Sequence, residues 1–312
     1  MSTKSRAIFD QHLAPTTPFP MGLEIAKAQG SYLYSREGKP YLDMIAGVAV
    51  SNLGHGHPAI REALHRQVDE HLHLMVYGEY VQSPVNDLVE KLTGMLPPDL
   101  DSCYLTNSGA EAVEGALKLA KRATGRRELV AFRGSYHGST HGALSVSGNE
   151  TKKRAFRPVL PEVRFLPFGV KEMLREGITE KTAAVIIEPI QGDAGVRIPP
   201  DDFLALLKER CEAVGALLIM DEIQTGMGRT GPLYAFEHWG VPPHILCTAK
   251  ALGAGLPLGA FVASEELMHS FTHNPMLGHL TTFGGNPLSC AAAVAALETW
   301  EKEELAGKTE SK

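Results

Sequence analysis

The stretch ALLIMDEIQTGMGRTGPLYAFEHWGVPPHILCTAKALGAG, residues 216–255, indicates how this chain folds. Its first apolar run, 216–220, ends at two acids, Asp221 and Glu222, and a second run at 244–247 ends shortly before Lys250. In an open α/β sheet the carboxyl ends of the strands face the ligand crevice. We therefore expect Asp221 and Lys250 to reach the same crevice from neighbouring strands.

Lys250 is isolated from other charges in the sequence. It is the only Asp, Glu, Lys or Arg between Glu237 and Glu265, and its neighbours are threonine, alanine, leucine and glycine. Burial of a lone ammonium is unfavourable, so its pKa should fall towards that of a nucleophilic amine. Most lysines are surface charges, but the isolation of this one favours a Schiff-base lysine.

The overall composition is that of an ordinary globular protein, with 44% hydrophobic and 21% charged residues among 312. The net charge of −6, with acids and bases interspersed, argues against a nucleic-acid partner. The four cysteines are widely spaced and form no CxxC pair, which indicates buried thiols in a reducing compartment. No apolar run is long enough to span a bilayer and the first residues have no signal-peptide pattern. These features predict a cytoplasmic protein without a membrane partner.

The N-terminal part shows three kinds of segment. Residues 1–22 are rich in proline and threonine and should form an extended arm, and residues 30–44 have the alternation of a hairpin around a turn at 36–39. We assign residues 1–50 to an incomplete small domain. Helices are expected at 57–72 and 83–96, each with a proline in its first turn.

From Ser102 onward, apolar runs alternate with helical stretches, which predicts a mostly parallel, seven-stranded α/β sheet covered by helices on both faces. The last strand has no room for a helix before it and should be antiparallel. Residues 51–286 would form this large domain, and an alanine-rich helix from Pro287 to Glu304 would begin an interdomain helix that is cut short by a polar tail, AGKTESK, within 287–312. The expected strands are 103–105, 129–132, 163–166, 183–187, 217–220, 245–247 and 259–263, and the helices between them 110–123, 170–176 and 202–214.

Two further segments have the residues of a cofactor site. The turn 107–111, NSGAE, opens a helix, whose N-terminus offers free N–H groups to a phosphate, although an ordinary serine cap is the alternative. Tyr136 has glycines at 134 and 138, so it could lie flat on an aromatic cofactor, although a loop tyrosine is the alternative. His137 and His141 have no carboxylate between them, and we predict no metal site.

The sequence GMGRTG at 226–231 matches the dinucleotide pattern GxGxxG. That pattern requires its first glycine directly after a strand and an acid about twenty residues further on. Here four residues separate Asp221 from the first glycine, Gly226. The position twenty residues beyond Gly228, where the pattern requires an acid, is Thr248. We therefore interpret the match as accidental.

Together the segments fit one cofactor, pyridoxal phosphate. Lys250 supplies an amine, Asp221 a carboxylate for the pyridine nitrogen, residues 108–110 a phosphate site, and Tyr136 a cover for the ring. An acid that keeps the ring nitrogen protonated makes the ring an electron sink.

The motifs NSGAEA, SYHG, EPIQGDAG, MDEIQTGMGRTG, TAKALGAGLPLGA and TTFGGNP, in this order, closely resemble those of the class-III aminotransferases. The resemblance covers Gly22 to Trp300 and implies the pyridoxal-phosphate fold of type I, that of aspartate aminotransferase. By this resemblance Lys250 is the Schiff-base lysine and proton shuttle, and Asp221 pairs with the pyridine nitrogen.

The resemblance also implies the roles of other residues and an obligate homodimer with shared active sites. Ile223 and Tyr136 would flank the ring, and Gln224 would bond the ring hydroxyl. The further implied cofactor-side residues are Ser108, Gly109, Ala110, His137, Glu188 and Thr282, the last of which would reach the partner subunit's phosphate. Glu188 and Asp193 would lie towards the substrate.

Two departures from the family bear on the substrate. Members that use acetylornithine, ornithine or 4-aminobutyrate usually carry an arginine where this chain has Ser139, and Asp193 replaces a usual glutamate. These departures favour donors with a differently held carboxylate, or plain amines.

We predict ping-pong amino transfer from an amine or ω-amino acid to a 2-oxo acid, 2-oxoglutarate or pyruvate. The alternatives are an aminomutase or amino-acid racemase of the same family, or a truncated chain that binds the cofactor with little activity.

Overall fold

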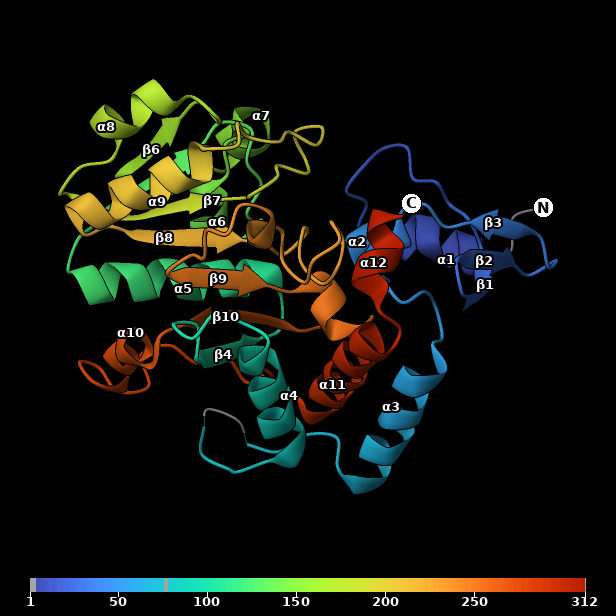
Figure 1. Cartoon of the computed structure of the whole chain (residues 1–312). Coiled ribbons are helices and arrows are strands. Elements are labelled where there is room, and N and C mark those ends of the chain that lie inside the picture. The colour runs from blue at the N-terminus through green and yellow to red at the C-terminus, as the bar shows by residue number, and fades with distance from the viewer. Residues whose placement is uncertain (1–3, 76–77, 312) are drawn as a thin grey trace.

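The structure is a computed structural model that describes residues 4–75 and 78–311, and within them seven strands form a central sheet (Figure 1). β10 is antiparallel to both β4 and β9, whereas the pairs β9–β8, β8–β7, β7–β5 and β5–β6 are parallel. The mostly parallel sheet and its antiparallel strand are therefore confirmed. In spatial order the strands are β4 (Ser102–Thr106), β10 (Gly259–Ala263), β9 (Ile245–Thr248), β8 (Leu217–Asp221), β7 (Thr182–Ile187), β5 (Glu128–Phe132) and β6 (Val163–Leu166).

Both faces of this sheet are buried, which explains why its strands are almost continuously apolar. Alternate side chains point to opposite faces. Leu218 and Met220 of β8 belong to one apolar cluster with residues of α9 (Phe203–Val214) and α11 (Pro287–Lys302). Ile219 belongs to the other cluster, with residues of α5 (Gly109–Thr124). The two clusters hold β8 and β9 in register and so fix the edge where their carboxyl ends meet.

The N-terminal segment forms a separate small sheet at one end of the molecule, away from the central sheet (Figure 1). Its antiparallel strands are β1 (Ile25–Gln29), β2 (Tyr32–Ser35) and β3 (Pro40–Leu42), so the expected hairpin is confirmed and gains a strand. The expectation of an extended arm over 1–22 is wrong for α1 (Lys4–His12), where an Arg6–Asp10 ion pair of 3.0 Å links successive turns.

Two other expectations also require correction. The helix expected at 170–176 divides into a 3₁₀ turn, Lys171–Met173, and α8 (Leu174–Gly177), because only Leu174 and Gly177 of this stretch are buried and can anchor it to the core. The tail after α11 is not irregular: Glu304 adopts a left-handed conformation with a φ of +51°, and the chain continues as α12 (Leu305–Glu310).

The remaining helices connect the sheet and cover its edges. α11 packs against α3 and α4, which confirms two expected helices, and α2 contacts the turn that begins at Lys250. The bounds are α2 (Ala46–Ala49), α3 (Pro58–Glu70), α4 (Ser83–Gly94), α6 (His141–Val146), α7 (Glu150–Lys153) and α10 (Glu265–His269), with 3₁₀ turns at Arg154–Phe156, Ala235–His238, Lys250–Gly253 and Ser270–Thr272.

Candidate active site

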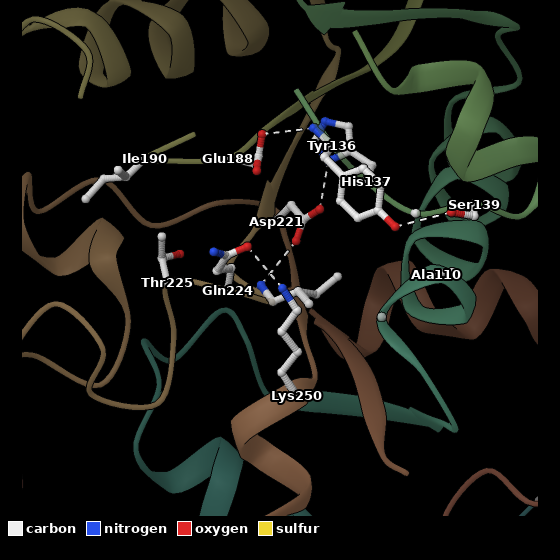
Figure 2. Close-up of a pocket in the computed structure, with 13 residues that line it drawn as sticks. Ala110, Tyr136, His137, Ser139, Glu188, Ile190, Asp221, Gln224, Thr225 and Lys250 are labelled. Carbon is white, nitrogen blue, oxygen red and sulfur yellow. Dashed lines mark hydrogen bonds and ion pairs between the residues drawn. The ribbon is translucent and has the colours of Figure 1, made fainter. Parts of the chain in front are cut away.

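A cavity of about 280 Å³ lies at the carboxyl ends of β8 and β9. Asp221 is the last residue of β8, and Lys250 follows β9 by two residues. Since the two strands are adjacent and parallel, both side chains enter the same cavity (Figure 2). The described lining residues are Gly109, Ala110, Tyr136, His137, Gly138, Ser139, Glu188, Ile190, Asp221, Ile223, Gln224, Thr225 and Lys250.

The Lys250 amine is held within this cavity. Its Nζ donates to Gln224 Oε1 at 3.1 Å. Burial lowers the pKa of Lys250 below its usual 10.5, and the negative charges of Asp221 and Glu188 oppose the shift. The backbone of Lys250 has a φ of +48°, an unfavourable conformation for a side chain other than glycine's, and such strain concentrates at functional sites. The lowered pKa and the enforced position both suit a reactive amine.

Asp221 is fixed by two hydrogen-bonded neighbours. Its Oδ2 lies 2.7 Å from His137 Nδ1, and its Oδ1 accepts from the N–H of Ile223 at 3.1 Å. The side chains of His137 and Asp221 are 0% and 4% exposed. His137 Nε2 is buried and has no hydrogen-bond partner among the described residues. The pair therefore holds one acidic group in a single orientation inside the cavity.

Glu222, the second acid at the same strand end, does not line the cavity and forms hydrogen bonds with other parts of the chain. One of its oxygens accepts from the Thr225 hydroxyl and the Ala235 N–H, and the other accepts from the Phe236 N–H at 2.7 Å. Burial nevertheless raises the pKa of Glu222 to about 7. Its contacts tie β8 to the turn at Ala235–His238, so Glu222 supports the structure around the cavity.

The loop after β5 forms one wall of the cavity. The N–H of Tyr136 donates to Glu188 Oε2 at 3.1 Å, and the Tyr136 hydroxyl lies 3.2 Å from Ser139 Oγ (Figure 2). Burial raises the pKa of Glu188 to about 7, and the nearby Asp221 charge adds to the shift. Glu188 thus positions the Tyr136 backbone, and its burial favours the protonated form of its carboxyl group.

The N-terminus of α5 lines the cavity next to this loop, since a Cβ on Gly138 would lie 2.8 Å from Ala110 Cβ. The Ser108 side chain accepts from the Glu111 N–H at 3.2 Å, as an N-cap does, and it is not among the described residues that line the cavity. A Cβ on Gly109 would lie 2.8 Å from Ile223 Cδ1, so the close approach of helix and Ile223 requires glycine. The first N–H groups of a helix lack partners within it and can bind an anion.

Besides Ser108, two further residues expected at the site are not among the described residues that line the cavity. Asp193 forms an ion pair with Lys152 at 2.6 Å. Thr282 is exposed on the surface. Sequence reasoning missed three lining residues, Gly138, Ile190 and Thr225, although each lies within a motif quoted for the resemblance or next to a residue named from it.

The GMGRTG segment has the geometry expected of an accidental match. Gly226 lies beyond the end of β8 in a run of turns, and the next regular element is the 3₁₀ turn Ala235–His238. A dinucleotide pyrophosphate needs a helix N-terminus directly after such glycines. This segment therefore offers no dinucleotide site.

The donor set fits pyridoxal phosphate. The cavity joins free N–H groups of a helix N-terminus, a buried carboxylate with a fixed orientation, and an amine of lowered pKa. These are the groups that a phosphate, a pyridine nitrogen and an aldehyde require. In the part of the chain that the structure describes, no cluster of three or more His, Cys, Asp or Glu could hold a metal ion, and no helix is long and apolar enough to cross a membrane.

Comparisons with known sequences agree with this geometry. The model of the family "Aminotransferase class-III" matches residues 14–312. The chain is 43% identical over 309 residues to the acetylornithine aminotransferase of Methanopyrus kandleri. The matched region covers 99% of this chain and 78% of that protein. It is 39% identical to the [LysW]-aminoadipate semialdehyde/glutamate semialdehyde transaminase of Sulfurisphaera tokodaii, over 91% of this chain and 72% of that protein.

Solved structures show the same fold. The ornithine aminotransferase of Toxoplasma gondii, described with pyridoxal phosphate at its active site, superposes with a TM-score of 0.89 at 33% identity and covers 98% of this chain and 72% of its own. An (S)-enantioselective omega-transaminase from Thermomicrobium roseum superposes with a TM-score of 0.87 at 30% sequence identity. The match covers 96% of this chain and 74% of that structure's chain. The chain therefore belongs to the class-III aminotransferases, which have fold type I and use pyridoxal phosphate.

Proposed function

We propose that this chain transfers an amino group from an amine or ω-amino acid to a 2-oxo acid, 2-oxoglutarate or pyruvate, by a ping-pong mechanism. The observation that carries the proposal is the cavity shared by Lys250, whose pKa is lowered, and Asp221, which His137 holds in place. This is the pair of groups that pyridoxal-phosphate chemistry requires at opposite ends of the ring.

Each end of the cofactor has a matching group in the cavity. The N–H groups of Gly109 and Ala110 would hold the phosphate, with the Ser108 hydroxyl as a further donor. Asp221 would keep a proton on the pyridine nitrogen, and its hydrogen bond with His137 holds the carboxylate in one orientation. When bound, the cofactor supplies an electron sink that stabilises negative charge at the carbon bearing the amino group.

The reaction also requires a base that takes up and returns a proton. The half-buried Nζ of Lys250 is the candidate, because its lowered pKa allows it to be neutral nearer to neutral pH. Ile223 and Tyr136 would flank the ring and exclude water from it. Gln224, which now accepts from Lys250, would turn to the ring hydroxyl.

The substrate proposal combines the relatives with one departure. The sequence relatives are named as transaminases of acetylornithine and of semialdehydes, which supports donors that carry an amino group remote from a carboxylate. Ser139 lines the cavity where donor-binding arginines are usual in the family, so we propose that the donor carboxylate is held by a different residue.

We also propose a homodimer in which Thr282 reaches the partner's phosphate site. Its support is an exposed apolar surface, where Tyr80, Val81 and Phe283 are 58%, 91% and 57% exposed around a second cavity. Val81→Asp should halve the mass measured by light scattering, whereas Leu206→Asp on α9 should leave it unchanged. A monomeric wild type would contradict this part of the proposal.

We further propose that the chain is divided into an N-terminal segment 1–50, a large domain 51–286 and an interdomain helix from 287. We also propose a cytoplasmic location.

An assay with single donors and acceptors tests the reaction. The protein, loaded with pyridoxal phosphate, should convert pyruvate or 2-oxoglutarate to the amino acid with an ω-amino acid or an amine as donor. Double-reciprocal plots should be parallel, as for ping-pong kinetics. Racemisation or internal amino migration without any oxo acid would instead show a different reaction of the same cofactor.

A further inference from the structure

A third cavity, of about 200 Å³, adjoins the active-site cavity, and Tyr136 and Ser139 line both. We infer that this adjoining cavity binds the anionic end of the amino donor and that Lys152 is the cation that holds it. The inference rests on the proposed function and names a residue that determines its specificity. The other described residues that line the adjoining cavity are His141, Leu144, Ser147, Asn149, Lys152 and Phe156.

The charges around the adjoining cavity favour an anion. Among its described lining residues, Lys152 and His141 can carry positive charge and none is an Asp or Glu. A concave site lined by one sign of charge attracts ligands of the opposite sign. Lys152 Nζ lies 5.1 Å from the centre of the Tyr136 ring, so the ammonium lies close to the wall that the two cavities share.

Lys152 is available to a ligand because its present partner is weakly held. Asp193 Oδ2 lies 2.6 Å from Lys152 Nζ, and the two side chains are 36% and 48% exposed. Exposed ion pairs of this kind contribute about 0–1 kcal/mol, so a ligand carboxylate can replace Asp193 at little cost.

The adjacent Lys153, in contrast to Lys152, cannot bind a ligand because its ammonium is buried. Its ammonium is buried, donates to the Ser147 carbonyl at 2.9 Å and lies 4.0 Å from the centre of the Phe165 ring. Those contacts anchor α7 and leave Lys153 no freedom to meet a substrate. The two neighbouring lysines thus have separate roles, one structural and one facing the cavity.

The arrangement defines the class of donor. The amine must reach Lys250 in one cavity, while the anion lies at Lys152 in the adjoining cavity, and Tyr136 and Ser139 line both. An α-amino acid carries its carboxylate beside the amine and cannot meet both lysines. An ω-amino acid can, and Leu144 and Phe156 offer apolar contact to its methylene chain.

Paired donors test the role of Lys152. With pyruvate as acceptor, Lys152→Met should lower kcat/KM for 6-aminohexanoate by about 10–100-fold, the effect of losing one charge-assisted hydrogen bond. It should leave kcat/KM for hexylamine within about twofold, and Lys152→Arg should retain most activity with both donors. Lys171→Met is the matched control, since Lys171 forms an ion pair with Asp202 and lines neither described cavity. Equal losses with both donors, or no loss with either, would overturn the inference.

Binding of an unreactive carboxylate tests the site without turnover. Calorimetry on the cofactor-loaded protein should show hexanoate bound by the wild type, not by Lys152→Met, and more tightly by Asp193→Asn, which lacks the competing carboxylate. If no amino group is transferred but hexanoate binding depends on Lys152, the proposed function fails and the anion site stands. If amino transfer occurs and Lys152→Met binds hexanoate like the wild type, the anion site fails.

Discussion

At the scale of single residues, Asp221 and Glu222 show how environment separates two adjacent acids. Asp221 lines the cavity and is hydrogen-bonded to His137, whereas Glu222 is turned away and accepts three hydrogen bonds from Thr225, Ala235 and Phe236. Alternation along β8 puts consecutive side chains on opposite faces of the sheet. Of the two acids, only Asp221 therefore lines the cavity.

Substitution of the two acids should have different consequences. Asp221→Ala should lower kcat by about 10²-fold or more, as for the loss of one preorganised electrostatic group. Glu222→Ala should lower the free energy of unfolding by about 1–3 kcal/mol, because buried N–H groups lose their acceptor, with a smaller loss of kcat. Steady-state kinetics and urea unfolding would separate the two effects. Equal losses of kcat in both variants would mean that the wrong carboxylate has been chosen.

Glu188 makes stability depend on pH. Burial raises its pKa from 4.5 to about 7 in the folded chain. The folded state thus holds a proton that the unfolded chain has released, so this contribution to stability is full below pH 4.5 and is lost as pH rises through 7. The stability of Glu188→Gln relative to the wild type should increase between pH 5 and pH 8, by at most about 3 kcal/mol.

Urea unfolding of the cofactor-free protein at several pH values measures this effect. Glu209→Gln, at an exposed position on α9, is the control and should follow the wild type at each pH. A constant difference between Glu188→Gln and the wild type would show that Glu188 is already ionised in the folded state at pH 5.

Whether a site residue can be predicted from the sequence depends on how far along the chain the residues that define its role lie. Lys250 and Asp221 follow from local patterns, since each stands at the end of an apolar run. The contact between His137 and Asp221 spans 84 residues, and no local pattern reports it. Lys152 was missed as a site residue for a related reason: only the fold brings α7 to the wall of the cavity.

At the scale of elements, the first turn of α5 joins helix capping to ligand binding. Ser108 caps the helix, and the missing side chain at Gly109 lets Ile223 pack against the same turn. Any side chain at 109 must displace Ile223, and the cavity lies directly beside both residues. The glycine therefore allows Ile223 to pack closely beside the cavity.

Gly109→Ala should weaken the binding of pyridoxal phosphate by about tenfold, since displacing one packed side chain costs roughly 1–3 kcal/mol. Fluorescence titration of the cofactor-free protein gives the dissociation constant. Gly94→Ala is the control, because a Cβ at Gly94 of α4 would meet open space. Unchanged affinity in Gly109→Ala would show that Ile223 yields freely and does not define the site.

The elements that sequence patterns predict poorly are those with few buried contacts. The strands of the central sheet are buried on both faces, so their apolar runs locate them well. The segments 4–22, 170–176 and 305–309 have few buried side chains and lack a clear apolar period. Helices there depend on local pairs such as Arg6–Asp10 and on tertiary contacts that a pattern does not contain.

At the scale of the whole molecule, strand order is what makes the site. β8 and β9 are neighbours although 23 residues separate Asp221 from Ile245, and β10 returns between β9 and β4. Alternating strands and helices predict a parallel sheet but leave its order open. The expectation that these two strand ends meet came from the general rule that strand ends of an open α/β sheet face the ligand crevice, and the shared cavity agrees with it.

The covalent site of the cofactor tests the central claim most directly. The wild type, saturated with pyridoxal phosphate, is reduced with borohydride and digested, and its peptides are analysed by mass spectrometry. The account predicts a stable cofactor adduct on Lys250, with none on Lys152 or Lys153, and no adduct at this site in Lys250→Ala. An unmodified Lys250 in the saturated wild type, or a principal adduct on another lysine, would contradict it.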